Sequence, residues 1–234
     1  MIPKKIHYCW FGGNPKPQLV EQCIASWYEY CPDYEIIEWN ENNFDVNGIP
    51  YTAAAYADKK WAFVSDYARL ALVYEYGGVY LDTDVLLKSR CLDEWSKYDC
   101  WLACDDTRYV ATGLGFGATK GNEIIGALMN AYKDYTYPAG TNASRDTVIL
   151  EKALPGWVKS ERSVVIDGSV LIIGCTDYGR YASHLYAYSW SEDPSRVKTI
   201  IQEEPLSKLE QRKKDLQWRF LQTIHHPTIL TFMD

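Results

Sequence analysis

The stretch Gly77–Leu87, GGVYLDTDVLL, places two carboxylates at the end of an apolar run that should be buried. The glycine pair ends a helical pattern, because glycine takes the left-handed conformation after a helix without a steric clash. Residues 79–87 then read as a central strand. Asp82 and Asp84 face the same side of such a strand, since side chains alternate along it. Two like charges this close repel, and removing them from water is costly.

A divalent cation would offset that cost directly. Mg²⁺ and Mn²⁺ prefer carboxylate oxygens and keep coordination positions open for phosphate. The alternative is a strand end that simply reaches water and carries two solvated aspartates. A DxD triplet alone does not distinguish these two interpretations, because such triplets are common.

The helix predicted over residues 59–76 brings further charge to the same place. At about 1.5 Å per residue it descends about 16 Å from Asp66 to Gly77, and the strand then climbs about 13 Å from Gly78 to Asp82. Asp66 and Arg69 therefore return to the level of the two aspartates, at the carboxyl end of the strand, where open α/β sheets hold ligands. They are expected on the helix face opposite an apolar stripe of Phe63, Tyr67, Leu70, Ala71 and Tyr74.

The first forty residues predict a strand, a helix and a second strand, over 5–11, 17–31 and 34–39, which is how a parallel sheet begins. Trp10 ends the first strand beside Gly12-Gly13, where its indole could stack on a nucleobase or pack in the core. The pattern weakens after residue 90. There we predict strands near 99–104, 113–118, 163–167 and 169–173, helices near 121–134 and 146–154, a strand or ordered loop over 184–190, and an amphipathic helix over 205–224.

The chain as a whole is predicted to form one α/β domain over residues 1–234, with a mixed, mostly parallel sheet flanked by helices. A net charge of −7 argues against long-range attraction to nucleic acid or anionic lipid. The seven cysteines read as reduced, mostly buried thiols. Such thiols lead us to expect a cytoplasmic protein. The sequence shows no run of about 18 apolar residues, so we expect no membrane span.

These motifs resemble glycosyltransferase family 32, which includes bacterial capsular-polysaccharide sugar transferases and yeast mannosyltransferase relatives. The resemblance is dense over residues 1–90 and thin afterwards. Relatives carry a late HHxAGSW motif, and this chain has Leu185 where they have the second histidine. The segments that carry the resemblance are IPKKIHYCWFGG, SWYEYCPDYEIIEWNENNFD, KKWAFVSDYARLALVYEYGGVYLDTDV and SHLYAYSW.

The resemblance implies a GT-A fold, a nucleotide-diphosphate-sugar donor, Mn²⁺ or Mg²⁺, and transfer with retention at the anomeric carbon. Residues 1–90 would form the nucleotide-sugar half, and residues 91–234 the acceptor half with the C-terminal helix. The implied catalytic residues are Asp66, Arg69, Asp82 and Asp84, and the implied metal ligands are Asp82, Asp84 and His184. The implied donor-binding residues are Tyr8, Trp10, Ser65, Asp66, Arg69, Asp82, Thr83, Ser189 and Trp190.

The expected activity is transfer of a hexose from UDP-galactose, UDP-glucose or GDP-mannose to a glycan or lipid-linked acceptor, in surface polysaccharide biosynthesis. The C-terminal helix could then contact the inner face of the membrane peripherally. Two alternatives stay open. One is a phosphatase of the haloacid-dehalogenase type with Asp82 as nucleophile, because VYLDTDVLL also fits its signature. The other is a carbohydrate-binding module without catalysis.

Overall fold

The computed structural model of the chain describes residues 1–138 and 142–185. Within them, a seven-stranded sheet has the strand order β2-β1-β3-β6-β5-β8-β7. Strands β1 and β3 run parallel to each other, and so do β1 and β2, whereas β6 and β7 run antiparallel to their neighbours. The strands are β1 (Lys5–Cys9), β2 (Glu35–Trp39), β3 (Gly78–Tyr80), β5 (Cys100–Ala103), β6 (Phe116–Ala118), β7 (Val164–Ile166) and β8 (Val170–Ile173).

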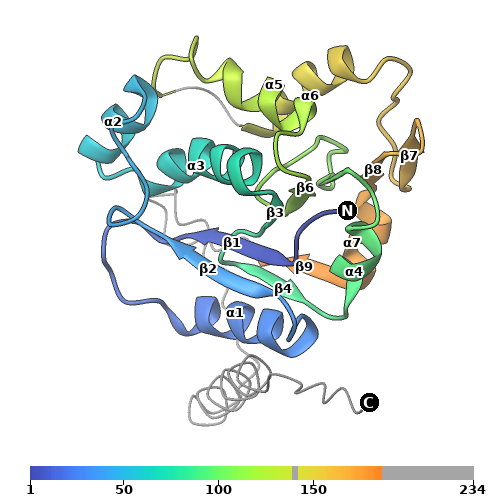
Figure 1. Cartoon of the computed structure of the whole chain (residues 1–234), viewed down its shortest axis with the longest axis horizontal. Helices are drawn as coiled ribbons and strands as arrows, with labels where there is room; N and C mark the ends of the chain where they lie inside the picture. The colour runs from blue at the N-terminus through green and yellow to red at the C-terminus, as the bar shows by residue number, and fades with distance from the viewer. Residues whose placement is uncertain (139–141, 186–234) are drawn as a thin grey trace, which may run out of the picture.

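Helices cover both faces of this sheet, as Figure 1 shows for α3 on one side of β1 and β2 and α1 on the other. Strand alternation divides the core accordingly: Tyr80 packs with the α3 side, and Val79 and Leu81 pack with the α1 side. The predicted α/β fold with a mixed, mostly parallel sheet is therefore confirmed. The α1 side holds α1 (Gln18–Tyr30), α4 (Cys91–Trp95) and α7 (Cys175–Tyr181), and the α3 side holds α2 (Pro50–Ala57), α3 (Trp61–Tyr76), α5 (Glu123–Ala131) and α6 (Asn142–Ala153).

The single strand predicted over residues 79–87 is wrong. β3 ends at Tyr80, a turn follows, and β4 (Val85–Leu87) belongs to a separate two-stranded sheet with β9 (Ala182–His184). The backbone N–H of Val85 donates to the carbonyl of Asp82 at 3.0 Å, which closes the turn. Asp82 and Asp84 therefore lie on a turn between two sheets, and strand alternation is not what brings them together.

The buried face of α3 also differs from the predicted stripe. Val64, Ala68, Leu72 and Arg69 are buried, whereas Tyr74 is 36% exposed. The predicted stripe assumed one apolar face, but α3 packs against α2 and α5 as well as β1. Its covered surface is therefore broader than one stripe, and it includes the arginine that the pattern placed on the outer face.

Several other predictions meet the structure only in part. The short helices α4 and α7 were not predicted, because five and seven residues carry too little periodicity to detect. The segment predicted over 184–190 overlaps β9 at His184, and its residues beyond 185 lie outside the described residues, as does the predicted helix over 205–224. None of the described helices has the length and apolar character needed to cross a bilayer.

Helix α6 fixes the loop that precedes β6. The Thr112 hydroxyl donates to Oδ2 of Asp146 at 3.1 Å, and the Val110 N–H donates to the Thr147 hydroxyl oxygen at 2.9 Å. Asp146 is 1% exposed. Burial, with a contribution from the charge of Asp66, raises the pKa of Asp146 to about 7. A carboxyl group that titrates near neutrality thus supports the loop.

We expect replacement of Trp27 by alanine to lower the free energy of unfolding by about 3–5 kcal/mol. The side chain is fully buried, and its Nε1 donates to the Val85 carbonyl at 2.8 Å, so it ties α1 to β4. Trp27→Phe removes mainly the hydrogen bond and should cost about 1–3 kcal/mol. Urea denaturation measures both. If both variants lowered the free energy of unfolding equally, the indole volume would contribute nothing beyond the hydrogen bond, which would contradict this prediction.

The contribution of Asp146 to the stability of the protein should fall as pH rises from about 4 to about 7. Native Asp146 keeps its proton up to about pH 7, whereas the unfolded chain releases it near pH 3.8. Between these pH values the folded protein binds more protons than the unfolded chain, so folding becomes less favourable as the pH rises. At 1.36 kcal/mol per unit the contribution is up to about 4 kcal/mol. In urea denaturation, Asp146→Asn should reduce the decrease in the free energy of unfolding between pH 5 and pH 8. Asp134→Asn, at an exposed position, should leave that decrease unchanged. Equal pH dependence in wild type and Asp146→Asn would contradict the assignment.

Candidate active site

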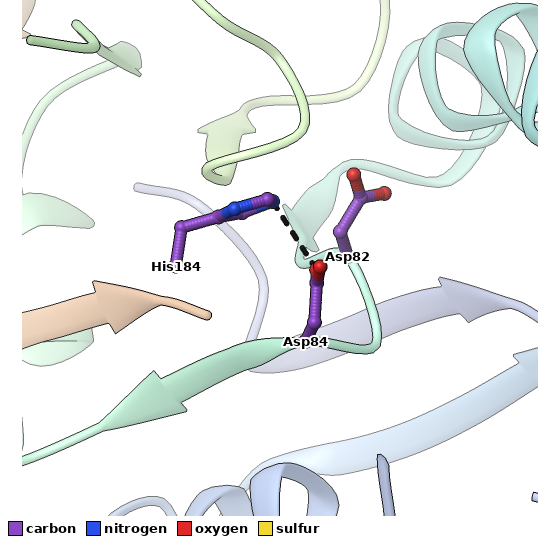
Figure 2. A group of neighbouring side chains, drawn as sticks. All are labelled: Asp82, Asp84 and His184. Carbon is purple, nitrogen blue, oxygen red and sulfur yellow. Dashed lines mark ion pairs between the residues drawn. The ribbon is translucent and has the colours of Figure 1, made fainter. Parts of the chain in front are cut away.

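Three side chains converge where β4 begins and β9 ends. Val85 pairs with His184 across the two-stranded sheet, so the imidazole lies next to the turn that carries Asp82 and Asp84. His184 Nε2 is 3.2 Å from Oδ1 of Asp84, and ligand atoms of all three residues lie within 4.8 Å of one another. Figure 2 shows the two aspartates rising from one turn and His184 reaching toward them from β9. We call Asp82, Asp84 and His184 the acidic triad.

The backbone holds the acidic triad from two sides. The N–H of Leu185 donates to the carbonyl of Asp84 at 2.9 Å, and the indole of Trp27 binds the next carbonyl in the chain, that of Val85. Two carboxylates and one imidazole at this spacing offer the oxygen and nitrogen ligands that divalent metals use in proteins. The acidic triad therefore has the composition and geometry to hold one divalent cation.

A buried arginine connects α3 to the turn. Arg69 is 3% exposed, and its Nη2 lies 3.1 Å from Oδ1 of Asp66 and 3.3 Å from Oδ1 of Asp82. Its Nε donates to the carbonyl of Ser65 at 3.0 Å, and its guanidinium lies 5.0 Å from the centre of the Tyr80 ring. These contacts join Asp66, Arg69 and Asp82, three of the four charged residues predicted at one end of the sheet. Asp84 joins them through the acidic triad.

The electrostatics of this cluster depend on that arginine. Burial raises the pKa of Asp82, and Asp84 adds to the rise, while the Arg69 guanidinium opposes it. Burial likewise raises the pKa of Asp66 against the effect of Arg69. Tyr80 donates its hydroxyl to Oδ1 of Asp82 at 2.8 Å and so fixes the carboxylate orientation. Positive charge near these carboxylates therefore favours their ionised forms.

One nitrogen of Arg69 has no hydrogen-bond partner within residues 1–138 and 142–185. Nη1 is buried and makes no hydrogen bond to any described residue. Gly113 lies directly beside it: an added Cβ there would sit 3.2 Å from Nη1 and 2.5 Å from Oδ2 of Asp82. A buried donor without a partner is unfavourable, so the notch at Gly113 is suited to an oxygen-bearing ligand. Gly113 belongs to the glycine-rich segment 111–118.

Asp66 has a further partner that the sequence did not indicate. Asn142, the first residue of α6, donates its Nδ2 to Oδ1 of Asp66 at 2.8 Å. Arg69 binds the same oxygen, so within the described residues Oδ2 is the Asp66 oxygen left to accept a bond from a ligand. Asn142 follows Asp66 by 76 positions, and no local motif relates residues so far apart.

The remaining predicted donor-binding residues fall into three groups. Ser65 lies inside the cluster, where its hydroxyl accepts from Nη2 of Arg69 at 3.3 Å, and Thr83 lies in the turn between the aspartates. Tyr8 is 7% exposed and donates to Oε2 of Glu38 at 2.6 Å, so its hydroxyl is used within the core. Ser189 and Trp190 lie outside the described residues.

Trp10 lies just past the carboxyl end of β1, as predicted. It is half-buried, and its Nε1 donates to the carbonyl of Asn14 at 2.7 Å. The ammonium of Lys16 lies 5.7 Å from the ring centre and also binds Glu38 at 2.7 Å. The indole is thus held in place beside a lysine. Its stacking on a nucleobase stays a prediction.

Comparison with known sequences identifies a matching family. The profile described as "Glycosyltransferase sugar-binding region containing DXD motif" matches residues 17–102. The inositol phosphoceramide mannosyltransferase 3 of Schizosaccharomyces pombe is 31% identical over 128 residues, which are 53% of this chain and 35% of that protein. The human alpha-1,4-N-acetylglucosaminyltransferase is 29% identical over 108 residues, 46% of this chain and 30% of that one. The chain therefore spans about a third of these relatives.

The fold agrees with that match. The solved structure of the PaToxG glycosyltransferase superposes with a TM-score of 0.53 at 19% sequence identity, covering 66% of this chain and 70% of that one. At that identity the likeness concerns the fold alone, which is the predicted GT-A type. The profile match includes the segment from Asp66 to Asp84 that forms the centre of the candidate site. These findings support the resemblance to glycosyltransferase family 32 over residues 17–102.

Proposed function

We propose that the protein is a metal-dependent glycosyltransferase, which moves a hexose from a nucleotide-diphosphate sugar to a hydroxyl group of a glycan or lipid-linked acceptor. The observation that carries the proposal is the acidic triad beside Arg69, whose buried Nη1 has no partner among the described residues. A cation site and a buried guanidinium next to each other match the two needs of a sugar diphosphate: charge neutralisation and fixed hydrogen bonding.

Mn²⁺ is the cation we propose for the acidic triad. Asp82 and Asp84 supply hard carboxylate oxygens, which suit Mg²⁺ and Mn²⁺ alike, whereas the imidazole of His184 suits transition metals. The mixed set of ligands therefore favours Mn²⁺ over Mg²⁺. When bound, the metal would supply positive charge for the diphosphate.

The chain's own residues would then stabilise the departing diphosphate and orient the sugar. The bond between the anomeric carbon and the diphosphate oxygen breaks, and negative charge grows on that oxygen, which Arg69 can stabilise from its buried position. Asn142 fixes Asp66 through Oδ1, and Oδ2 of Asp66 can accept a hydrogen bond from a sugar hydroxyl group. The acceptor oxygen bonds to the anomeric carbon, and its proton passes to the leaving diphosphate.

We propose retention at the anomeric carbon, with same-face attack assisted by the leaving group. Asp66 and Asp82 are both bound to Arg69 on their Oδ1 atoms, which lowers their nucleophilicity. A covalent sugar–carboxylate intermediate is therefore not part of the proposal. Mass spectrometry of the protein after rapid mixing with donor tests this point, because an isolated glycosyl adduct on either aspartate would overturn it.

For the donor we propose UDP-galactose or UDP-glucose, with GDP-mannose as second choice.

The family match supports neither of the two alternative functions, the phosphatase and the non-catalytic carbohydrate-binding module. We further propose that the product is a surface polysaccharide and that the reaction takes place in the cytoplasm, with the protein peripheral at the inner face of the membrane. A thermal-shift screen of nucleotide sugars with and without Mn²⁺ tests the donor, because binding raises the melting temperature. Failure of every nucleotide sugar to do so would overturn the proposed function.

Asp84→Asn should weaken Mn²⁺ binding at pH 7 by at least tenfold, because an amide supplies no charge to the cation. Isothermal titration calorimetry of the protein with Mn²⁺ measures this. Asp99→Asn is the matched control, since Asp99 is outside the acidic triad. An unchanged Mn²⁺ affinity in Asp84→Asn would mean that the cation binds elsewhere.

Gly113→Ala should weaken binding of the uridine diphosphate sugar at least tenfold without unfolding the protein. The added methyl group would lie 2.5 Å from Oδ2 of Asp82, so either the carboxylate or the loop must move. Gly48→Ala is the control, because its Cβ would approach the Asp45 carbonyl on an exposed loop at 3.3 Å. Titration calorimetry in Mn²⁺ separates the two variants. Equal donor affinity in both would contradict a ligand site at the Gly113 notch.

A further inference from the structure

A cavity of about 170 Å³ opens beside the acidic triad. His184 belongs to its lining and to the acidic triad, so the cavity and the cation site share a wall. Other lining residues come from three separate parts of the chain: Asp106 after β5, Leu114 before β6, and Gly179 and Ser183 from α7 and β9. None of these four has a role in the cation and arginine contacts described above.

The walls of this cavity are held by hydrogen bonds. Tyr178, which is 5% exposed, donates its hydroxyl to the carbonyl of Leu114 at 2.7 Å and so ties α7 to the loop that carries Gly113. Oδ1 of Asp105 accepts from the backbone N–H groups of Thr107 at 2.9 Å and Tyr109 at 3.2 Å, which fixes the turn after β5. The cavity is therefore bounded by positions that the fold holds in place.

We propose that this cavity binds the acceptor, and that it takes the terminal ring of a neutral saccharide. The inference rests on the proposed glycosyl transfer and deepens it. A hydroxyl group of a ring in the cavity would be directed past His184 toward the acidic triad, where the donor diphosphate is proposed to bind. Leu114 offers an apolar surface to one side of the ring, and Asp106 and Ser183 offer hydrogen-bonding groups.

The volume sets the size of this ligand. At about 30 Å³ for each water molecule, a cavity of about 170 Å³ holds about five or six waters. Pockets that enclose drug-sized ligands are larger, roughly 300–1,000 Å³. One pyranose ring with its hydroxyl groups is therefore the unit that fits, and further residues of a glycan would extend outside the cavity.

The charge of the lining selects against anionic acceptors. Asp105 and Asp106 are both in the lining, and among the described lining residues there is no lysine or arginine. The whole chain carries a net charge of −7. A uronic acid or phosphorylated sugar would thus meet the like charges of Asp105 and Asp106, with no lysine or arginine in the described lining to pair with, whereas hydroxyl groups can donate to these carboxylates.

Gly179 provides a direct way to close the cavity. A Cβ added there would meet no atom within 4 Å, and its φ is outside the range that disfavours side chains. Leucine at this position should extend into open space, and it is a better helix former than glycine. Gly179→Leu should therefore fill the cavity without unfolding α7. Thr176→Leu is the matched control, because Thr176 is exposed on the same helix and is not in the lining.

The test uses the whole chain with Mn²⁺ and a nucleotide sugar, and it measures acceptor-free donor hydrolysis, transfer, and saturation-transfer NMR of methyl glycosides. In Gly179→Leu we expect acceptor KM to rise at least tenfold and the NMR signal to disappear, while donor KM and donor hydrolysis stay unchanged. Thr176→Leu should match wild type in all four. Unchanged acceptor KM in Gly179→Leu, or a rise in donor KM instead, would overturn the proposal.

A second arm tests the charge. Wild type should prefer neutral methyl glycosides over methyl uronides by at least tenfold in kcat/KM, and Asp106→Asn should narrow that preference. Equal use of both classes by wild type would overturn the neutral-acceptor assignment. The proposed function fails in a different way: wild type would then neither hydrolyse nor bind any nucleotide sugar, whereas failure of the cavity proposal alone leaves donor hydrolysis and donor binding intact.

Discussion

The buried guanidinium of Arg69 is the interaction on which the site depends. It sits 3% exposed between Asp66 of its own helix and Asp82 of the turn after β3. Burial alone would push the pKa values of both carboxyl groups up, and the positive charge acts against that rise. Because one arginine serves both acids, α3 and the turn are held at one fixed separation. The position of this turn then determines where Asp84 and the cation site lie.

The turn also joins two sheets, and this gives the site its shape. β3 continues the large sheet, whereas β4 leaves it and pairs with β9. That exchange puts His184 opposite Val85 and places the cavity between α7 and the loop before β6. The proposed donor side, with Arg69 and Gly113, and the proposed acceptor side, with Gly179 and Asp106, thus meet at the acidic triad. Tyr178 and α6 hold the loop between them from opposite ends.

Asn142 and Asp146 show how helix α6 extends the site beyond its charged centre. Asn142 occupies Oδ1 of Asp66, and Asp146 supports Thr112, the residue before Gly113. Each fixes a residue next to the charged centre, because Asp66 pairs with Arg69 and Thr112 precedes Gly113. Changes in α6 would therefore alter the walls of the proposed sugar site while leaving its charges in place, which is one route by which related proteins could differ in donor.

Local patterns in the sequence determined the strand–helix–strand start, the helix that ends at Gly77, and the return of Asp66 and Arg69 to the level of Asp82, since helix rise and strand rise are properties of neighbouring residues. The sequence resemblance also implied His184 as a metal ligand. Only the tertiary structure decided that residues 79–87 split between two sheets, that Arg69 is buried, and that Gly113 and Asn142 adjoin the carboxylates. Those features arise from contacts between segments far apart in the chain, such as Val85 with His184, and no local periodicity encodes such pairing.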